Sequence, residues 1–133
     1  MNARRLTLRL LPDTYAICRF EPDAAMPAWL PRKGFTAAIR TEEEFSIYCD
    51  QNAVPHDVRA ARGWRSLQLV GPFDFDETGV IASVAAPLAE AGISISVLAT
   101  YDTDYLFVRN EALDSAAEIL QGAGHRVVGH DRL

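Results

Sequence analysis

The sequence is poor in cysteine and histidine. Its 133 residues include two cysteines, Cys18 and Cys49, and three histidines, His56, His125 and His130. The cysteines have no CxxC spacing and each lies in an apolar, strand-like run, which predicts free thiols in a core instead of a disulfide or redox centre. The histidines have no spacing that would gather them on one helix face. We therefore expect surface histidines and no metal site.

Positive charge and long apolar runs are scarce as well. The chain has 13 Lys and Arg residues against 18 Asp and Glu, a formal net charge of −5. A nucleic-acid-binding surface needs clustered basic residues to replace phosphate counterions, so no nucleic-acid partner is expected. No apolar run approaches the roughly 18 residues of a membrane-spanning helix, and Arg9 and Pro12 interrupt the run near the N-terminus. We therefore expect a cytoplasmic protein without a membrane partner.

Signatures of catalysis are missing from the sequence. It contains no P-loop, no GxGxxG turn and no HExxH motif. Glu77 and Asp104 could form a carboxylate pair for acid–base chemistry, but no nucleophile, metal-ligand cluster or phosphate loop accompanies them. We therefore predict no catalytic residues, no cofactor and no enzymatic activity.

The first half of the chain has the pattern of a strand-rich, helix-poor unit. Strand-like runs cover residues 6–11, 15–20, 35–39 and 45–48. Residues 21–31 contain three prolines around Trp29, which predicts a loop whose tryptophan plugs the core. The polar stretch 50–63, with a proline and a terminal glycine, is the best candidate for a junction. It places a domain boundary near Arg62.

The second half has a more regular order of elements. The expected elements are a strand at 64–70, a helix at 81–91, strands at 93–97 and 105–108, a helix at 113–120 and a strand at 125–128. In the first helix, Ile81, Val84 and Leu88 recur at helical spacing and Gly92 follows as a C-terminal cap. Pro87 lacks an N–H and predicts a kink or an early stop. This βαββαβ order is typical of an α+β, ferredoxin-like fold with a four-stranded antiparallel sheet and both helices on one face.

The loop before the first expected helix has the chemistry of a small-ligand site. Backbone N–H groups around Thr78, Gly79 and Val80 are unpaired at a helix N-terminus and can bind a carboxylate. Asp76 or Glu77 could hold an ammonium or guanidinium group. The alternative is that these residues only cap the helix and complement its dipole.

Two segments carry a family resemblance: FDETGVIA at residues 75–82 and PLAEAGISISVLATYDTDYLFV at 87–108. Through them the second half resembles an ACT domain, the amino-acid-binding regulatory module of aspartate kinases. Through RTEEEFSIYC at 40–49 and GWRSLQLVGPFDF at 63–75, the chain is also similar to the two-ACT proteins related to the CASTOR arginine sensors. The resemblance implies two tandem ACT-like units: a degenerate, helix-poor one at 1–62 and an ACT domain at 63–133.

The resemblance also implies where a ligand would bind. In such sensors the ligand lies at an interface between ACT units, against the strand-to-helix loop and the strand-to-strand turn. Carried over by position, the ligand-binding residues are Asp74, Asp76, Glu77, Thr78, Gly79, Val80, Thr100, Tyr101 and Asp104, with Val58 and Arg59 from the segment before the tryptophan-led strand. Asp74 stands where the sensors have glycine, which adds a negative charge and narrows the pocket.

These observations lead to one expected function and two alternatives. The expected function is a regulatory sensor that binds an amino acid or a similar small metabolite and works as a homodimer. One alternative is a ligand-free ACT-type scaffold that mediates protein assembly. The other is an enzyme acting on amino acids, in which Glu77 would be essential for turnover.

Overall fold

The computed structural model describes residues 4–74 and 76–129 of the chain. The chain divides into two compact units. We call residues 13–64 the strand unit, and residues 1–12 together with 65–133 the mixed unit. No helix in the described part of the chain is long and apolar enough to cross a membrane.

The N-terminal strand belongs to the mixed unit. Strand β1 (Thr7–Leu10) pairs antiparallel with β5 (Ala60–Leu69) and parallel with β8 (Arg126–Val128). The structure therefore divides the chain differently from the expected domains 1–62 and 63–133. An alternating pattern identifies a strand but not the strands with which it pairs, so the sequence could not show this return of the N-terminus.

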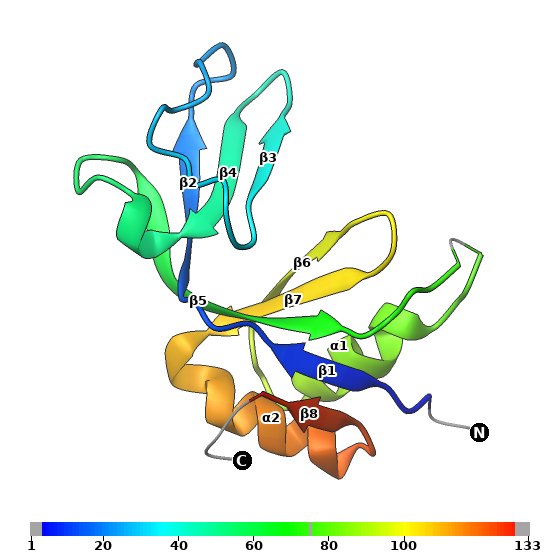
Figure 1. Ribbon diagram of the computed structural model, residues 1–133. Helices are drawn as coiled ribbons and strands as arrows, with labels where there is room; N and C mark the ends of the chain where they lie inside the picture. Colours follow the sequence, from blue (N-terminus) through cyan, green and yellow to red (C-terminus); the bar gives the residue numbers. More distant parts are fainter. Residues whose placement is uncertain (1–3, 75, 130–133) are drawn as a thin grey trace. The chain divides into compact units, whose positions relative to one another are not determined.

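The strand unit is built from antiparallel strands. Strand β4 (Phe45–Asp50) lies between β2 (Tyr15–Phe20) and β3 (Ala37–Arg40), and β2 also pairs with the first part of β5. A single 3-10 turn, η1 (Gln51–Ala53), follows β4 (Figure 1). Residues 13–64 are all described and contain no α-helix, which confirms the prediction of a helix-poor first half.

A loop closes the core of the strand unit. Trp29 packs against this core and its ring centroid lies 6.3 Å from that of Phe20, as expected for a tryptophan plug. Cys18 and Cys49 are free and fully buried among its apolar residues, in agreement with the sequence. Burial, with smaller contributions from the Cys18 thiol and Asp50, raises the pKa of Cys49 to about 12. These thiols are therefore suited to packing and not to nucleophilic chemistry.

The mixed unit has the expected order of elements around an enlarged sheet. Helix α1 (Val80–Glu90) precedes β6 (Ile95–Ala99), and α2 (Leu113–Gly122) follows β7 (Asp104–Arg109) and a 3-10 turn, η2 (Asn110–Ala112). The strand order is β6-β7-β5-β1-β8. The α+β, ferredoxin-like class is confirmed. Strand β1 adds a fifth strand between β5 and β8, and its parallel pairing with β8 makes the sheet mixed.

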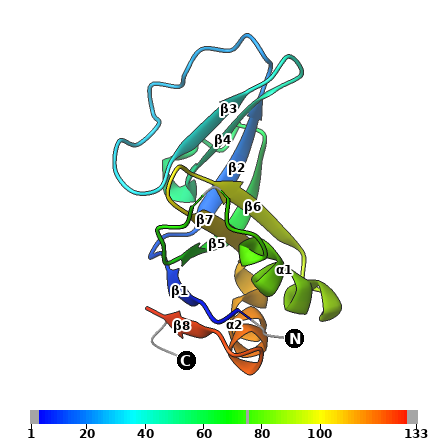
Figure 2. The same cartoon turned by 90° about the vertical axis from the view of Figure 1, so that its right-hand side faces the viewer.

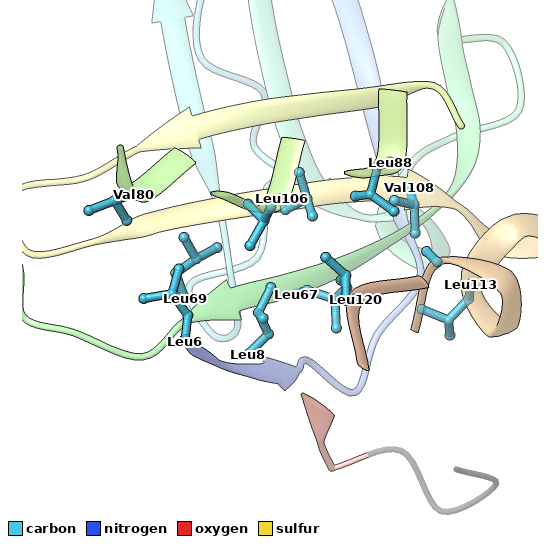
Figure 3. Close-up of a cluster of buried hydrophobic side chains, with 12 residues drawn as sticks. Leu6, Leu8, Leu67, Leu69, Val80, Leu88, Leu106, Val108, Leu113 and Leu120 are labelled. Carbon is cyan, nitrogen blue, oxygen red and sulfur yellow. The ribbon is translucent and has the colours of Figure 1, made fainter. Parts of the chain in front are cut away.

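Both helices cover the same face of this sheet. Leu67 and Leu69 are two residues apart on β5, so their side chains point to one face, where they meet α1 and α2. Figure 3 shows Leu88 of α1 beside Val108 of β7, and Leu120 of α2 beside Leu67. The two helices also contact each other (Figure 2). Each fully buried leucine stabilises the fold by about 1.5–3 kcal/mol relative to an exposed one.

Pro87 does not stop α1, which continues to Glu90. Proline removes the N–H that would have bonded the Ser83 carbonyl. The His125 side chain replaces that donor, with its Nε2 2.9 Å from the Ser83 oxygen. Its Nδ1 accepts a hydrogen bond of 3.1 Å from the Leu6 amide, so the ring is neutral with its proton on Nε2.

The expectation that His125 lies on the surface is therefore wrong, since only 5% of the residue is exposed. Its two hydrogen bonds join β8 to α1 and to the start of β1, a combination of segments that the sequence does not bring together. His56 is exposed as expected. His130 lies outside the described residues.

Candidate functional site

Hydrogen bonds join two connecting segments of the mixed unit, the loop before α1 and the turn between β6 and β7. The Phe73 amide, in the loop before α1, donates to the Asp102 carbonyl in the turn between β6 and β7 (2.9 Å). The Thr103 hydroxyl donates to the carbonyl of Leu69 at the end of β5. A Cβ at Gly71 would lie 3.0 Å from the Asp102 oxygen, a tight contact, so a larger residue would push the loop and the turn apart.

A small cavity of about 150 Å³ lies between this loop and this turn. Six of the expected ligand-binding residues line it: Asp74, Glu77, Val80, Thr100, Tyr101 and Asp104. Within the turn, the Thr100 amide donates to the Thr103 carbonyl (2.8 Å), which keeps the two sides of the turn close. The structure therefore brings together the loop and the turn that the sequence predicted to converge.

Asp104 is the carboxylate in this cavity with the most distinctive environment. It is half-buried, and its side chain makes no hydrogen bond or ion pair with a described residue. Desolvation by burial raises the pKa of the Asp104 carboxyl above its usual range. A partly dehydrated carboxylate without a partner gains from a cationic ligand, because the ligand supplies the missing hydrogen bonds and charge.

Glu77 is already engaged by the protein. Its Oε1 accepts a hydrogen bond of 3.0 Å from the Asp74 amide, and its Oε2 lies 2.9 Å from Nη1 of Arg4. The Glu77 amide in turn donates to the Asp74 carbonyl (3.0 Å). Glu77 therefore shapes the loop and is neutralised by an arginine, a role that its place next to a helix did not reveal.

The start of α1 supplies hydrogen-bond donors. Gly79 is the N-cap residue, with φ of +79°, and no side chain caps the helix. Because the first amides of a helix have no intrahelical partner, those near Val80 can bind an anion. Val80 lines the small cavity, whereas Thr78 and Gly79 line a second cavity of about 700 Å³ along α1. The nine loop and turn residues thus do not all meet in one cavity.

Three expected ligand-binding residues are not among the residues that line these two cavities. Asp76 is exposed and lines neither cavity. Val58 and Arg59 belong to the strand unit, where Val58 packs against the core and the Arg59 carbonyl accepts a hydrogen bond from the Arg19 amide (2.9 Å). The segment that carries Val58 and Arg59 thus has a packing role in its own unit.

Other residues of the site were missed by sequence reasoning. Phe73, Ala99, Asp102 and Thr103 also line the small cavity. Asp102 and Thr103 lie in the same turn as Asp104, so the turn itself was the available signal. Arg4 offered no signal, because it lies 73 residues before Glu77 in the sequence. In the described part of the chain, no three His, Cys, Asp or Glu side chains gather in a way that could hold a metal ion.

A family model described as ACT domain matches residues 59–122, which include the loop, the turn and both helices of this site. Residues 59–122 therefore match the ACT domain family. A separate model, described as an N-terminal domain, matches residues 13–57. That match falls on the strand unit, whose degenerate ACT-like character stays a prediction.

Known proteins similar to this chain fall into three groups. The cytosolic arginine sensor for mTORC1 subunit 1 of Homo sapiens is 39% identical over 59 residues, which are 44% of the chain and 18% of the sensor. A crystal structure of an Agrobacterium tumefaciens protein is 42% identical, covers 96% of both chains and has a TM-score of 0.91. An aspartate kinase of Clostridium acetobutylicum shares the fold at 8% identity, with a TM-score of 0.65 over 92% of the chain and 36% of the kinase.

Proposed function

We propose that the mixed unit is a regulatory module that binds a small amino acid in the cavity between the α1 loop and the β6–β7 turn. The observation that carries the proposal is Asp104, a half-buried carboxylate in that cavity without a partner among the described residues. The ammonium group of the ligand would pair with Asp104. Its carboxylate would accept hydrogen bonds from the uncapped amides near Val80.

The size of the cavity favours a short ligand. A water molecule in the liquid occupies about 30 Å³, so 150 Å³ corresponds to about five waters. This volume suits the ammonium and carboxylate head of an amino acid with a small side chain. The side chain of arginine, after which the curated relative is named, would extend beyond this volume toward the open side of the cavity.

A second copy of the chain is part of the proposal. Tyr101 lines the cavity and is 80% exposed, an unusual exposure for a large aromatic residue. Aromatic residues are enriched at protein interfaces, so a homodimer contact that covers Tyr101 would also close the cavity. Binding would then act by favouring one arrangement of subunits over another. The proposed location is the cytoplasm, which is also where the printed name of the human relative places it.

Thermal unfolding with each of the twenty amino acids, followed by calorimetry of the hits, tests the proposal. A ligand at a hundred times its Kd raises the free energy of unfolding by about 2.7 kcal/mol. We expect a small neutral amino acid to raise the Tm of the wild type and to have no effect on Asp104→Asn. Glu118→Gln is the matched control, because Glu118 is exposed on α2 and should leave binding unchanged. If no amino acid binds the wild type, the proposed function is wrong.

Assembly without a ligand is the second candidate function. The larger cavity of about 700 Å³ is lined by small residues of α1, among them Gly79, Ala82 and Ala86, and could receive part of a partner protein. Under this alternative, Gly79→Asp alters the oligomeric state measured by sedimentation, and no amino acid shifts the Tm of any variant. Loss of the ligand-induced Tm shift in Asp104→Asn would therefore indicate sensing, whereas a changed oligomeric state in Gly79→Asp without any Tm shift would indicate assembly.

We also propose that the chain has no enzymatic activity. Among the described residues, the two cysteine thiols are buried in the strand-unit core, and Glu77 is committed to Arg4 and to the Asp74 amide. An enzyme acting on amino acids would lose turnover in Glu77→Gln. Incubation of the protein with the amino acid that it binds, monitored by NMR, should leave that amino acid unchanged.

A further inference from the structure

Arg4 holds the loop that forms one wall of the proposed ligand site. Its Nη1 donates to Glu77 Oε2 at 2.9 Å, and its Nη2 donates to the Thr78 carbonyl at 3.2 Å. Arg4 precedes β1 and also lines the larger cavity along α1. One guanidinium group therefore binds the loop residue that lines the small cavity and the next residue, which lines the larger one.

The charges of the small cavity show what this contact changes. Four carboxylates line the cavity, those of Asp74, Glu77, Asp102 and Asp104, and no lysine or arginine is among its lining residues. In the described part of the chain, only the Glu77 carboxylate of these four has an ion pair. Asp74, Asp102 and Asp104 thus remain for the cationic groups of a ligand, whereas Glu77 already holds Arg4.

We propose that Arg4 is a specificity-determining residue, a tethered guanidinium group that occupies Glu77 and disfavours amino acids with a cationic side chain. The inference rests on the proposed function of the same site. A ligand with a neutral side chain needs only Asp104 and the amides near Val80. To pair with Glu77, the side chain of free arginine or lysine must displace a guanidinium group that the chain holds at high local concentration.

The expected size of the effect follows from the exposure of the contact. The side chains of Arg4 and Glu77 are 39% and 31% exposed, so the ion pair is partly screened by water. Exposed pairs of this kind have modest strength, and removal of the competitor should raise the affinity for arginine about two- to sixfold. The gain should shrink with added salt, because screening weakens the ion pair.

Calorimetric titration of four proteins tests the inference: the wild type, Arg4→Ala, Arg4→Gln and Arg5→Ala. Arg5 is the matched control, because it is exposed, makes no hydrogen bond or ion pair with a described residue, and contributes the same charge from the adjacent position. The probes are L-arginine, its uncharged analogue L-citrulline, and L-alanine at low salt. Arg4→Gln keeps most of the side-chain length and serves if Arg4→Ala is poorly folded.

We expect both Arg4 variants to bind arginine about two- to sixfold more tightly than the wild type, with unchanged affinity for citrulline and alanine. Arg5→Ala should behave as the wild type. An equal gain in Arg5→Ala would show a general charge effect and overturn the inference. Binding of alanine without any gain for arginine overturns the inference alone, whereas no binding of any amino acid to any variant overturns the proposed function as well.

Discussion

The strand unit and the mixed unit cover their sheets in different ways. The strand unit uses a proline-containing loop, from which Trp29 and Leu30 pack against a core of six buried residues. The mixed unit uses two helices, which meet the sheet in a core of twelve. Because stability scales with the apolar area buried, most of the hydrophobic stabilisation belongs to the mixed unit.

The two units also differ in their polar groups. The cavities of about 150, 320 and 700 Å³ are all lined by residues of the mixed unit, together with Asp104, Glu77 and Arg4. In the strand unit, the two thiols are buried among apolar residues of the core. The comparison teaches that the polar groups of the candidate site lie where the helices, the loop before α1 and the tight turn between β6 and β7 meet.

The largest expected effect is on the rate of thiol labelling, which reports on the strand unit because both cysteines of the chain lie there. A pKa of about 12 for Cys49 leaves very little thiolate at pH 8. We expect an aromatic disulfide reagent to react with the native protein on the order of a thousandfold more slowly than with the unfolded chain. Reaction of the native protein at the unfolded rate would show that the strand unit opens freely.

Core substitutions in each unit test whether the two cores are independent. Leu88→Ala in α1 and Ile47→Ala in β4 remove fully buried side chains and should each lower the free energy of unfolding by about 2–5 kcal/mol. Both tryptophans lie in the strand unit, so fluorescence reports on that unit, while far-ultraviolet circular dichroism reports on α1 and α2. We expect each substitution to shift mainly the signal of its own unit. Equal shifts of both signals would show one cooperative core.

His125→Ala tests the contact that allows a proline within α1. The substitution leaves the Leu6 amide and the Ser83 carbonyl without partners, at an expected cost of about 2–4 kcal/mol in chemical denaturation. In a Pro87→Ala background the new backbone N–H can bond the Ser83 carbonyl, so the cost should fall by about 1 kcal/mol. The same cost in both backgrounds would contradict this role of His125.

Of these substitutions, Asp104→Asn should change the free energy of unfolding the least. Its main effect should be on how that free energy depends on pH. The raised pKa means that the folded state binds a proton more readily than the unfolded state. Stability contributed by protonated Asp104 is therefore lost as the pH rises from the usual aspartate range through the raised value. Asp104→Asn should remove this slope and change the free energy of unfolding at pH 7 by less than about 0.5 kcal/mol. An unchanged slope between pH 3 and 6 would contradict the desolvation of Asp104.

Much of the site was predictable because its two parts are local in sequence. Ile93, Ile95 and Val97 alternate with polar residues and pack on the mixed core, as their pattern predicted. Asp104 and the loop before α1 converge as the family resemblance implied. Of the kink or early stop expected at Pro87, the early stop does not occur, because the missing helical donor is replaced by a histidine 42 residues from Ser83. A pattern within one helix cannot show such a donor.

The sequence by itself determined the two α-helices, the ferredoxin-like order of the mixed unit and the lack of helices in the first half, because hydrophobic periodicity and turn residues act over a few neighbours. Only the tertiary structure decided that β1 joins β5 and β8, that His125 is buried, and that Arg4 reaches Glu77. These contacts join segments far apart in the chain. Their formation depends on which surfaces the folded core brings within hydrogen-bonding distance.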